Sequence, residues 1–365
     1  MILEAWLGIV ASVGLWAFVK PRSHAGSFQG EALVVRPCHG AEPGLAERLA
    51  SGPSPRVLAV ATEDDPAMPV ARAVADARVV VTGATGPNAK AEQLGHALAD
   101  ATADVIVIAD SDVRLDDLAP LLRPLSDPAV AAVWAPPVEV APRTFADHAS
   151  AAVLDGSLHA FALLGALDTG GMVGKLVAIR RVDLEAVGGF GALRRHLGED
   201  MELARRLRAH GRALRMARMT ASSFAGGRTF GEVVARYARW LMVIRAQRPL
   251  LLLSYPLLFG AALPLLALAL ARGAWALALA TLVVRMLIAA FARIRSGHPR
   301  WLAPEALLAD VVLWAALFRA LGTRTVAWRG RVLRVEAGGL LADHGLVSQA
   351  SDASASRESP LSEVR

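Results

Sequence analysis

The stretch Ile106-Val107-Ile108-Ala109-Asp110-Ser111-Asp112 joins a buried-strand pattern to two carboxylates that follow it directly. A continuous apolar run rich in β-branched residues is typical of a strand that is covered on both faces of a sheet. Carboxylates at positions i and i+2 after such a strand can bind Mg²⁺ or Mn²⁺, since these hard cations prefer oxygen ligands. The alternatives are a solvated turn or a helix cap formed by Asp112, and the spacing alone does not choose among the three.

Strand and helix patterns alternate along the rest of the central region. Short apolar runs predict strands at residues 32–35, 56–61, 78–81 and 105–109, and the segments between them predict helices at 42–50, 70–77 and 89–101. This alternation predicts an α/β fold with a mostly parallel sheet that helices cover on both faces. Ligands bind beyond the carboxyl ends of such strands, where we expect Asp64, Asp65, Asp110 and Asp112.

Long apolar runs flank this region and raise the hydrophobic content of the 365-residue chain to 54%. Residues 2–19 form the first run, and positive charges follow it, which is typical of a retained anchor rather than a cleaved signal peptide. Residues 250–271 and 274–292 are each long enough to span a bilayer. Residues 302–321 carry three charges, and we expect them to re-enter the membrane or lie on its surface.

Basic residues indicate how the chain is oriented. Lys20 and Arg22 after the first run, and Arg293 and Arg295 after the third, place both ends on the cytoplasmic side. We therefore expect an integral membrane protein of a bacterial inner membrane with a cytoplasmic catalytic domain. The net charge of +6 lies beside apolar segments, so anionic lipid and a phosphorylated donor are favoured as partners over nucleic acid.

Cysteine and histidine give no sign of a metal centre. The single cysteine, Cys38, excludes a disulfide framework and a cysteine metal site within the chain. The following histidines lack metal-ligand spacing, and we interpret them as surface or partly buried residues: His39, His96, His148 and His159.

Three loops carry polar residues that each have two interpretations. Asp64-Asp65-Pro66 is either a simple turn or a carboxylate that accepts hydrogen bonds from a nucleotide. Lys90, where the chain enters a helix, either faces an anion together with the helix N-terminus or belongs to a solvated first turn. Glu199-Asp200 begins another helix, where the helix dipole favours acidic residues in any case. Either carboxylate of that pair could act as a general base on an acceptor hydroxyl.

Arg236, Arg239 and Trp240 occupy positions i, i+3 and i+4 of a helix expected over residues 230–247, so they share one helix face. One interpretation is an interfacial helix whose arginines meet lipid phosphates and whose tryptophan lies at headgroup depth. The other is a cationic clamp on a diphosphate, and the two are compatible.

Taken in order, these segments resemble the ceramide glucosyltransferase family, membrane-embedded inverting glycosyltransferases of GT-A fold, over about residues 34–339. The family signature is three spaced aspartates followed by (Gln/Arg)-x-x-Arg-Trp. Asp65, Asp110 and Asp200 stand at the aspartate positions, and Arg236-Tyr237-Ala238-Arg239-Trp240 matches the pentapeptide. Residues 88–90 are similar to the family's Asn-Pro-Lys, and residues 325–331 are similar to its C-terminal Trp-Arg segment. Hopanoid glycosyltransferases are close relatives.

The chain also departs from this pattern at two places. Asp112 stands where the family member compared has glycine, and residues 170–175 differ from its Thr-Gly-Met-Ser. The resemblance implies that Asp200 is the general base and that Asp110, with Asp112, carries a divalent cation, Mg²⁺ or Mn²⁺. It further implies that the donor is bound by Asp65, Lys90, Asp110, Arg236, Arg239 and Trp240.

The sequence thus predicts an inverting glycosyltransferase that moves a sugar, preferably glucose, from a UDP-sugar to the hydroxyl of a membrane lipid, with a ceramide-like acceptor favoured. One alternative is a hopanoid or other lipid N-acetylglucosaminyltransferase, and another is a non-catalytic scaffold that binds anionic lipid. The expected division of the chain is a transmembrane anchor (1–22), a GT-A catalytic domain (23–228), an interfacial helix (229–249), membrane segments (250–322), a basic segment (323–347) and a disordered tail (348–365).

Overall fold

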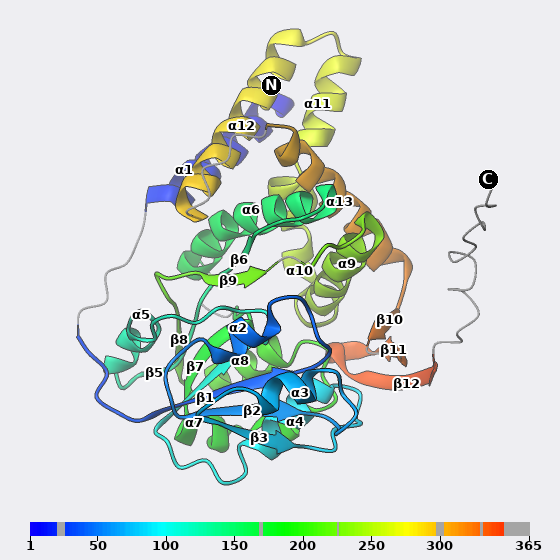
Figure 1. The fold of residues 1–365 in the computed structure, drawn as a ribbon. Coiled ribbons are helices and arrows are strands. Elements are labelled where there is room, and N and C mark those ends of the chain that lie inside the picture. Colours follow the sequence, from blue (N-terminus) through cyan, green and yellow to red (C-terminus); the bar gives the residue numbers. More distant parts are fainter. Residues whose placement is uncertain (20–25, 168–170, 225, 297–302, 329–330, 347–365) are drawn as a thin grey trace, which may run out of the picture.

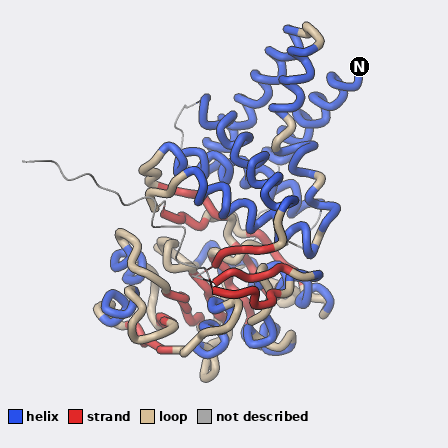
Figure 2. Tube along the Cα trace, turned by 90° about the vertical axis from the view of Figure 1, so that its right-hand side faces the viewer, coloured by secondary structure: helices blue, strands red, loops and turns tan. Residues whose placement is uncertain are grey.

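The computed structural model describes residues 1–19, 26–167, 171–224, 226–296, 303–328 and 331–346. Figure 1 shows an α/β unit at one end of the molecule and a group of apolar helices at the other, with a layer of helices between them. In Figure 2 the strands gather in the lower part and the helices dominate the upper part. The tail predicted at 348–365 lies outside the described residues.

A seven-stranded sheet forms the centre of the α/β unit, in the order β3-β2-β1-β4-β7-β5-β8. All its neighbouring pairs are parallel except those of β7, which runs antiparallel to β4 and β5. The prediction of a mostly parallel α/β sheet is therefore confirmed. Its strands are β1 (Ala32–Cys38), β2 (Arg56–Val60), β3 (Ala77–Val81), β4 (Val105–Ala109), β5 (Val130–Trp134), β7 (Leu176–Arg180) and β8 (Ala213–Met216).

Alternate residues of each strand face opposite sides of this sheet, and helices cover both sides. Ile106 and Ile108 of β4 pack with α4 (Ala89–Ala97) and α8 (Glu199–Ala209), whereas Val105 and Val107 pack towards α5 (Ala119–Leu122). The continuous apolar pattern of β4 is thus explained by burial on both faces. Further helices around the sheet are α2 (Leu45–Ala50), α3 (Ala67–Arg72) and α7 (Arg181–Ala186).

Two helix starts differ from the sequence prediction for local reasons. The helix α2 begins at Leu45 rather than at residue 42, because Gly44 adopts a left-handed conformation with φ 78°. The helix α3 begins at Ala67 rather than at residue 70, because the Asp65 carboxylate accepts the Ala67 N–H at 2.9 Å. A side chain that accepts a backbone N–H in this way stabilises the first helical turn.

The helices α6 (Phe145–Leu167), α9 (Phe230–Gln247) and α13 (Ala303–Gly322) form the layer between the sheet and the apolar helices (Figure 1). Their shared core includes Tyr237, Leu241 and Val312. The helix α9 has the predicted bounds and begins with a capping box, in which Thr229 and Glu232 satisfy each other's backbone N–H groups. Beside this layer lie two small sheets: β6 (Pro137–Val140) with β9 (Ala221–Phe224), and β10 (Thr325–Trp328), β11 (Arg331–Val335) and β12 (Leu341–Leu346).

The apolar helices are α1 (Ile2–Val19), α10 (Pro249–Leu252), α11 (Ala262–Ala271) and α12 (Trp275–Ser296). Within the described residues, one helix is long and apolar enough to cross a membrane, over Trp275–Ile294 of α12. The run 250–271, expected as one span, is instead bent by 52° between Pro249–Phe259 and Ala262–Ala271, so it counts as a span only if both pieces are taken together.

The bend has an identifiable cause, and two carbonyls beside it accept hydrogen bonds from tryptophan side chains. Residues Tyr255–Phe259 form a π-helix that contains Pro256, and proline removes a backbone donor from a helix. The Leu257 carbonyl accepts a hydrogen bond from Trp6 Nε1 at 2.7 Å, and the Gly260 carbonyl accepts one from Trp314 Nε1 at 2.9 Å. Side chains of α1 and α13 thus form hydrogen bonds with the backbone at the bend.

Candidate active site at the carboxyl edge of the sheet

The two aspartates of the opening stretch lie where β4 meets β7. Because these strands are antiparallel with Ala109 opposite Leu176, the end of β4 lies beside the start of β7. The Asp110 N–H donates to the Lys175 carbonyl at 2.9 Å. This pairing brings Lys175 beside the carboxylates of Asp110 and Asp112.

Asp112 is held by a lysine and a serine. Its Oδ2 atom accepts hydrogen bonds from the Lys175 ammonium and from Ser223 Oγ, the latter at 2.8 Å. Burial disfavours the ionised form, but Lys175 and Ser223 hold the pKa of Asp112 well below its usual range. Asp112 is therefore a carboxylate at every physiological pH.

Lys90 connects the carboxylate of Asp110 to the start of α8. Its Nζ atom lies 2.7 Å from Asp110 Oδ1 and 3.3 Å from Glu199 Oε1, and it donates to the Gly174 carbonyl at 3.0 Å. Burial opposes its positive charge, yet the neighbouring carboxylates of Asp110 and Glu199 raise the pKa of Lys90 above its ordinary value. Asn88 caps the start of α4 and also donates to Glu199 Oε2, at the start of α8, at 3.1 Å.

Asp200 is oriented by two backbone N–H groups. Its Oδ2 accepts from Gly174 at 2.7 Å, and its Oδ1 accepts from Met201 at 2.8 Å. Burial and the adjacent Glu199 carboxylate raise the pKa of Asp200 to about 6, although Lys90 and these N–H groups act in the opposite direction. Glu199 is engaged by Lys90 and Asn88, whereas the two hydrogen bonds of Asp200 come from backbone N–H groups.

Asp65 forms a separate cluster after β2. Its Oδ1 accepts the N–H groups of Gly40 at 2.8 Å and Ala67 at 2.9 Å, and its Oδ2 lies 2.7 Å from His39 Nδ1. Burial alone would raise the pKa of this carboxyl, but the two N–H groups and His39 lower it below the ordinary aspartate value. In the sheet, β1 lies between β2 and β4. Asp65 follows β2 and Asp110 follows β4, so the two aspartates come after strands that are not direct neighbours.

Arg236 of α9 is linked to the same region through the small β6–β9 sheet. Arg236 and Arg228 both pair with the buried Glu139 carboxylate, and the guanidinium of Arg236 lies 5.5 Å from the Trp240 ring centroid. Glu139 is the register partner of Ser223, whose hydroxyl holds Asp112. The helix α9 is thus linked to the Asp112 carboxylate through the adjacent strands β6 and β9.

Arg239 lies on α9 one turn after Arg236, and Trp240 packs against the core of the helical layer and, edge to face, against Tyr237. Arg236 is fixed by Glu139, although burial opposes its charge, and the carboxylate raises the pKa of Arg236 above its usual value.

The aspartate pair suits a cation that the substrate helps to bind. In the described part of the chain, no three or more His, Cys, Asp or Glu side chains are placed to hold a metal ion. Asp112 Oδ1 is buried and has no hydrogen-bond partner among the described residues. Because Mg²⁺ is typically held by one or two carboxylates together with substrate phosphates, Asp110 and Asp112 fit that kind of site.

Formal charge agrees with this fit. Four carboxylates and two ammonium groups leave an excess of two negative charges in the cluster made up of Asp110, Asp112, Glu199, Asp200, Lys90 and Lys175. A divalent cation would balance that excess, which lowers the cost of gathering so many acids in a partly buried place.

A model of the family described as Glycosyl transferase family 21, the ceramide glucosyltransferase family, matches residues 3–341. The chain belongs to this family. As a family 21 member it is an enzyme, a glycosyltransferase. The family resemblance predicted from the motifs is confirmed, and the non-catalytic scaffold is set aside.

Comparison with other proteins adds two solved structures. The family 21 chain is similar to mannosyltransferase PcManGT from Pyrobaculum calidifontis in complex with GDP-Man and Mn²⁺, with 19% identity, a TM-score of 0.47, and coverage of 87% of this chain and 99% of that chain. It is also similar to glucosyl-3-phosphoglycerate synthase from Mycobacterium tuberculosis in complex with phosphoglyceric acid, with 19% identity and a TM-score of 0.39. The match covers 64% of this chain and 82% of that chain. No match was found among curated proteins.

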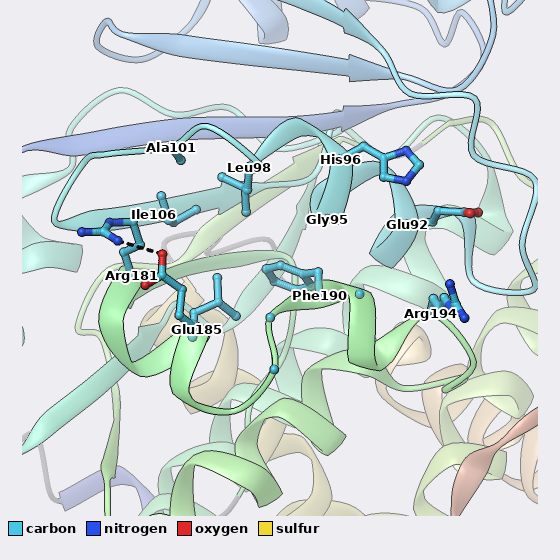
Figure 3. Close-up of a pocket in the computed structure, with 14 residues that line it drawn as sticks. Glu92, Gly95, His96, Leu98, Ala101, Ile106, Arg181, Glu185, Phe190 and Arg194 are labelled. Carbon is cyan, nitrogen blue, oxygen red and sulfur yellow. Dashed lines mark hydrogen bonds and ion pairs between the residues drawn. The ribbon is translucent and has the colours of Figure 1, made fainter.

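A cavity of about 340 Å³ in this family 21 chain lies apart from the carboxylates, between α4 and the turn before α8. Figure 3 shows His96 and Leu98 on one side and Phe190 on the other, with the Arg181–Glu185 ion pair at one end. Its lining consists of residues other than those predicted to bind donor or cation. This cavity is therefore distinct from the carboxylate cluster that the sequence predicted as the site.

Sequence reasoning missed four residues of the site, namely His39, Glu139, Lys175 and Ser223. A single acid between two valines, as in Val138-Glu139-Val140, was a usable signal, because a buried carboxylate in a strand requires a cationic partner. His39 and Lys175 carried no local signal, since their contacts depend on which strands become neighbours.

Proposed function

We propose that the chain transfers a sugar, preferably glucose, from a UDP-sugar to the hydroxyl of a membrane lipid, with a ceramide-like acceptor favoured, and inverts the anomeric centre. One observation supports this most directly. The Gly174 N–H holds Asp200, the Gly174 carbonyl holds Lys90, and Lys90 pairs with Asp110. This connected network supports the assignment of Asp200 as a base and of Asp110 as a diphosphate-binding carboxylate in one site.

On the donor side, Asp110 and Asp112 would hold a divalent cation together with the donor, and Asp65 and Lys90 would bind the nucleotide part. When bound, the cation supplies Lewis-acid stabilisation of the negative charge that develops on the leaving UDP. Arg236, Arg239 and Trp240 of α9 close the donor site on its membrane side. The link from α9 to Asp112 through Glu139 and Ser223 supports this arrangement.

On the acceptor side, Asp200 removes the proton of the lipid hydroxyl. The acceptor oxygen forms a bond to the anomeric carbon, the bond from that carbon to the UDP oxygen breaks, and the proton passes to the Asp200 carboxylate. A pKa of about 6 leaves Asp200 mostly ionised at neutral pH while making it a stronger base than an ordinary aspartate. A base positioned in this way typically contributes about 10²–10⁴-fold to the rate.

The lipid reaches this site from a membrane that the apolar helices occupy. The helix α12 is long enough to cross, and large apolar side chains are exposed along it, including Trp275, Leu279, Val283 and Leu287. The layer of α6, α9 and α13 lies between this helix and the sheet (Figure 1). We infer an integral membrane protein of a bacterial inner membrane whose α/β unit faces the cytoplasm.

The substitution Asp200→Asn tests the base. We expect the variant to bind UDP-glucose as the unchanged protein does, measured by isothermal titration, but to lose transfer to lipid. Asp116→Asn is the matched control, because it makes the same chemical change at an exposed side chain that pairs with Arg114. Transfer at the unchanged rate by the Asp200→Asn variant would refute the assignment of the base.

A lipid N-acetylglucosaminyltransferase, with a hopanoid or another lipid acceptor, is the second candidate within the same chemistry. The cluster of Asp110, Asp112 and Asp200 serves either donor, since it would act on the diphosphate and the acceptor hydroxyl rather than on the sugar. Parallel assays with UDP-glucose and UDP-N-acetylglucosamine decide between the two.

A further inference from the structure

Lys175 lies between the two carboxylates that we assign to the cation. Its Nζ atom pairs with Asp112 Oδ2 and lies 3.6 Å from Asp110 Oδ2. Its position is set by the backbone, because Lys175 immediately precedes β7 and its carbonyl accepts the Asp110 N–H. The side chain is only 14% exposed, so water screens these contacts weakly.

A divalent cation and the Lys175 ammonium therefore compete for the same oxygens. Two positive charges a few ångströms apart repel each other strongly where water is scarce. The side chain of Lys175 is long and flexible, so its ammonium can move away from Asp112 while its backbone stays in place.

Lys90 also pairs with Asp110, but it differs from Lys175 in having further partners. Besides Asp110 it contacts Glu199 and the Gly174 carbonyl, so it retains partners when a cation takes up Asp110. Within the described residues, the ion pairs of Lys175 are those with Asp110 and Asp112. If a cation displaces its ammonium, Lys175 needs a new anion nearby, and the donor diphosphate is such an anion.

We propose that Lys175 is a tethered counter-ion that occupies Asp110 and Asp112 until cation and donor arrive together, and that it then pairs with the donor diphosphate. This inference rests on the proposed function, in which those two aspartates hold the cation. It makes Lys175 a donor-binding residue and predicts that cation and nucleotide bind cooperatively. Without the donor, the cation binds weakly because it must displace the Lys175 ammonium, which has no other acidic partner among the described residues.

Binding of Mn²⁺ to the full chain in detergent, followed by electron paramagnetic resonance with and without UDP, tests this directly. We expect Lys175→Met to tighten Mn²⁺ binding without UDP by about tenfold, since a competing charge is removed. The gain in Mn²⁺ affinity that UDP produces is expected to shrink, because the diphosphate loses its ammonium partner. Lys175→Arg retains the charge and is expected to keep Mn²⁺ binding weak without UDP.

Arg181→Met is the matched control, because it removes one positive charge from an ion pair remote from the aspartates and is expected to leave Mn²⁺ binding unchanged. Mn²⁺ binding that is unchanged or weaker in Lys175→Met without UDP would overturn the inference, since it would make Lys175 a support for the two carboxylates. If the methionine variant does not fold, Lys175→Gln is subject to the same expectation. Absence of Mn²⁺ binding by the unchanged protein even with UDP would contradict the proposed function as well.

Discussion

At the residue scale, Asp200 is the group whose ionisation should control the rate. Burial and Glu199 raise the pKa of this carboxyl to about 6, and the base must be ionised to accept a proton. We expect kcat/KM to be level above pH 7 and to fall about tenfold per pH unit below pH 6. A rate profile with its midpoint near the ordinary aspartate value of about 4 would contradict this assignment.

At Gly174, the addition of a single methyl group is expected to lower the rate of transfer strongly. A Cβ atom added there would lie 3.0 Å from the Asp200 Cβ and 3.2 Å from its Oδ2. We expect Gly174→Ala to push the carboxylate aside and to reduce kcat by about 10²-fold, the usual cost of a misplacement near 1 Å. Steady-state kinetics measure this loss.

Gly171→Ala is the control for that experiment. A Cβ atom at Gly171 meets no other atom within 4 Å, so this substitution in the same loop is expected to leave kcat unchanged. Equal turnover in both variants would mean that Gly174 does not fix the position of the base.

At the element scale, α12 and α13 are joined by a buried ion pair. Arg285 in α12 donates to both carboxylate oxygens of Asp310 in α13, at 2.8 and 2.9 Å, and the Asp310 side chain is fully buried. This pairing explains how a run interrupted by charges becomes a helix that packs against its neighbours. A buried charge that loses its partner costs about 3–5 kcal/mol.

Arg285→Leu is therefore expected to lower the free energy of unfolding by about 3–5 kcal/mol, measured by denaturant titration in detergent. The double variant Arg285→Leu with Asp310→Leu should recover most of that loss, because it leaves no unpaired charge behind. A single variant as stable as the unchanged protein would show that the pair does not stabilise the packing of the two helices.

Elements with a strong local pattern were predictable. The strand β4 has the expected bounds, since a run of buried β-branched residues has few other conformations open to it. The helix α9 also has its predicted bounds, because Thr229 and Glu232 provide a capping box. The proline at position 256 could have indicated the bend, but the prediction over 250–271 considered only the length of the apolar run.

At the scale of the whole molecule, the site depends on contacts that no local pattern reveals. The strand β7 lies between β4 and β5 in the sheet and is antiparallel to both. This position brings Lys175, just before β7, next to Asp110 and Asp112. The pairing of β6 with β9 likewise links Glu139 to Ser223. Sequence therefore predicted the acids at the strand ends, whereas their basic and hydroxyl partners required the fold.

In the molecule as a whole, a layer of helices separates the aspartate cluster at the edge of the sheet from a candidate membrane span, and we propose that this arrangement serves the transfer of a sugar to a lipid. Mass spectrometry of lipid products tests that claim most directly, using the purified chain, membrane lipid extract and either UDP-glucose or UDP-N-acetylglucosamine, with Asp200→Asn as the blank. We predict a lipid heavier by one hexose with UDP-glucose that is missing from the blank. No glycosylated lipid with either donor would contradict the account.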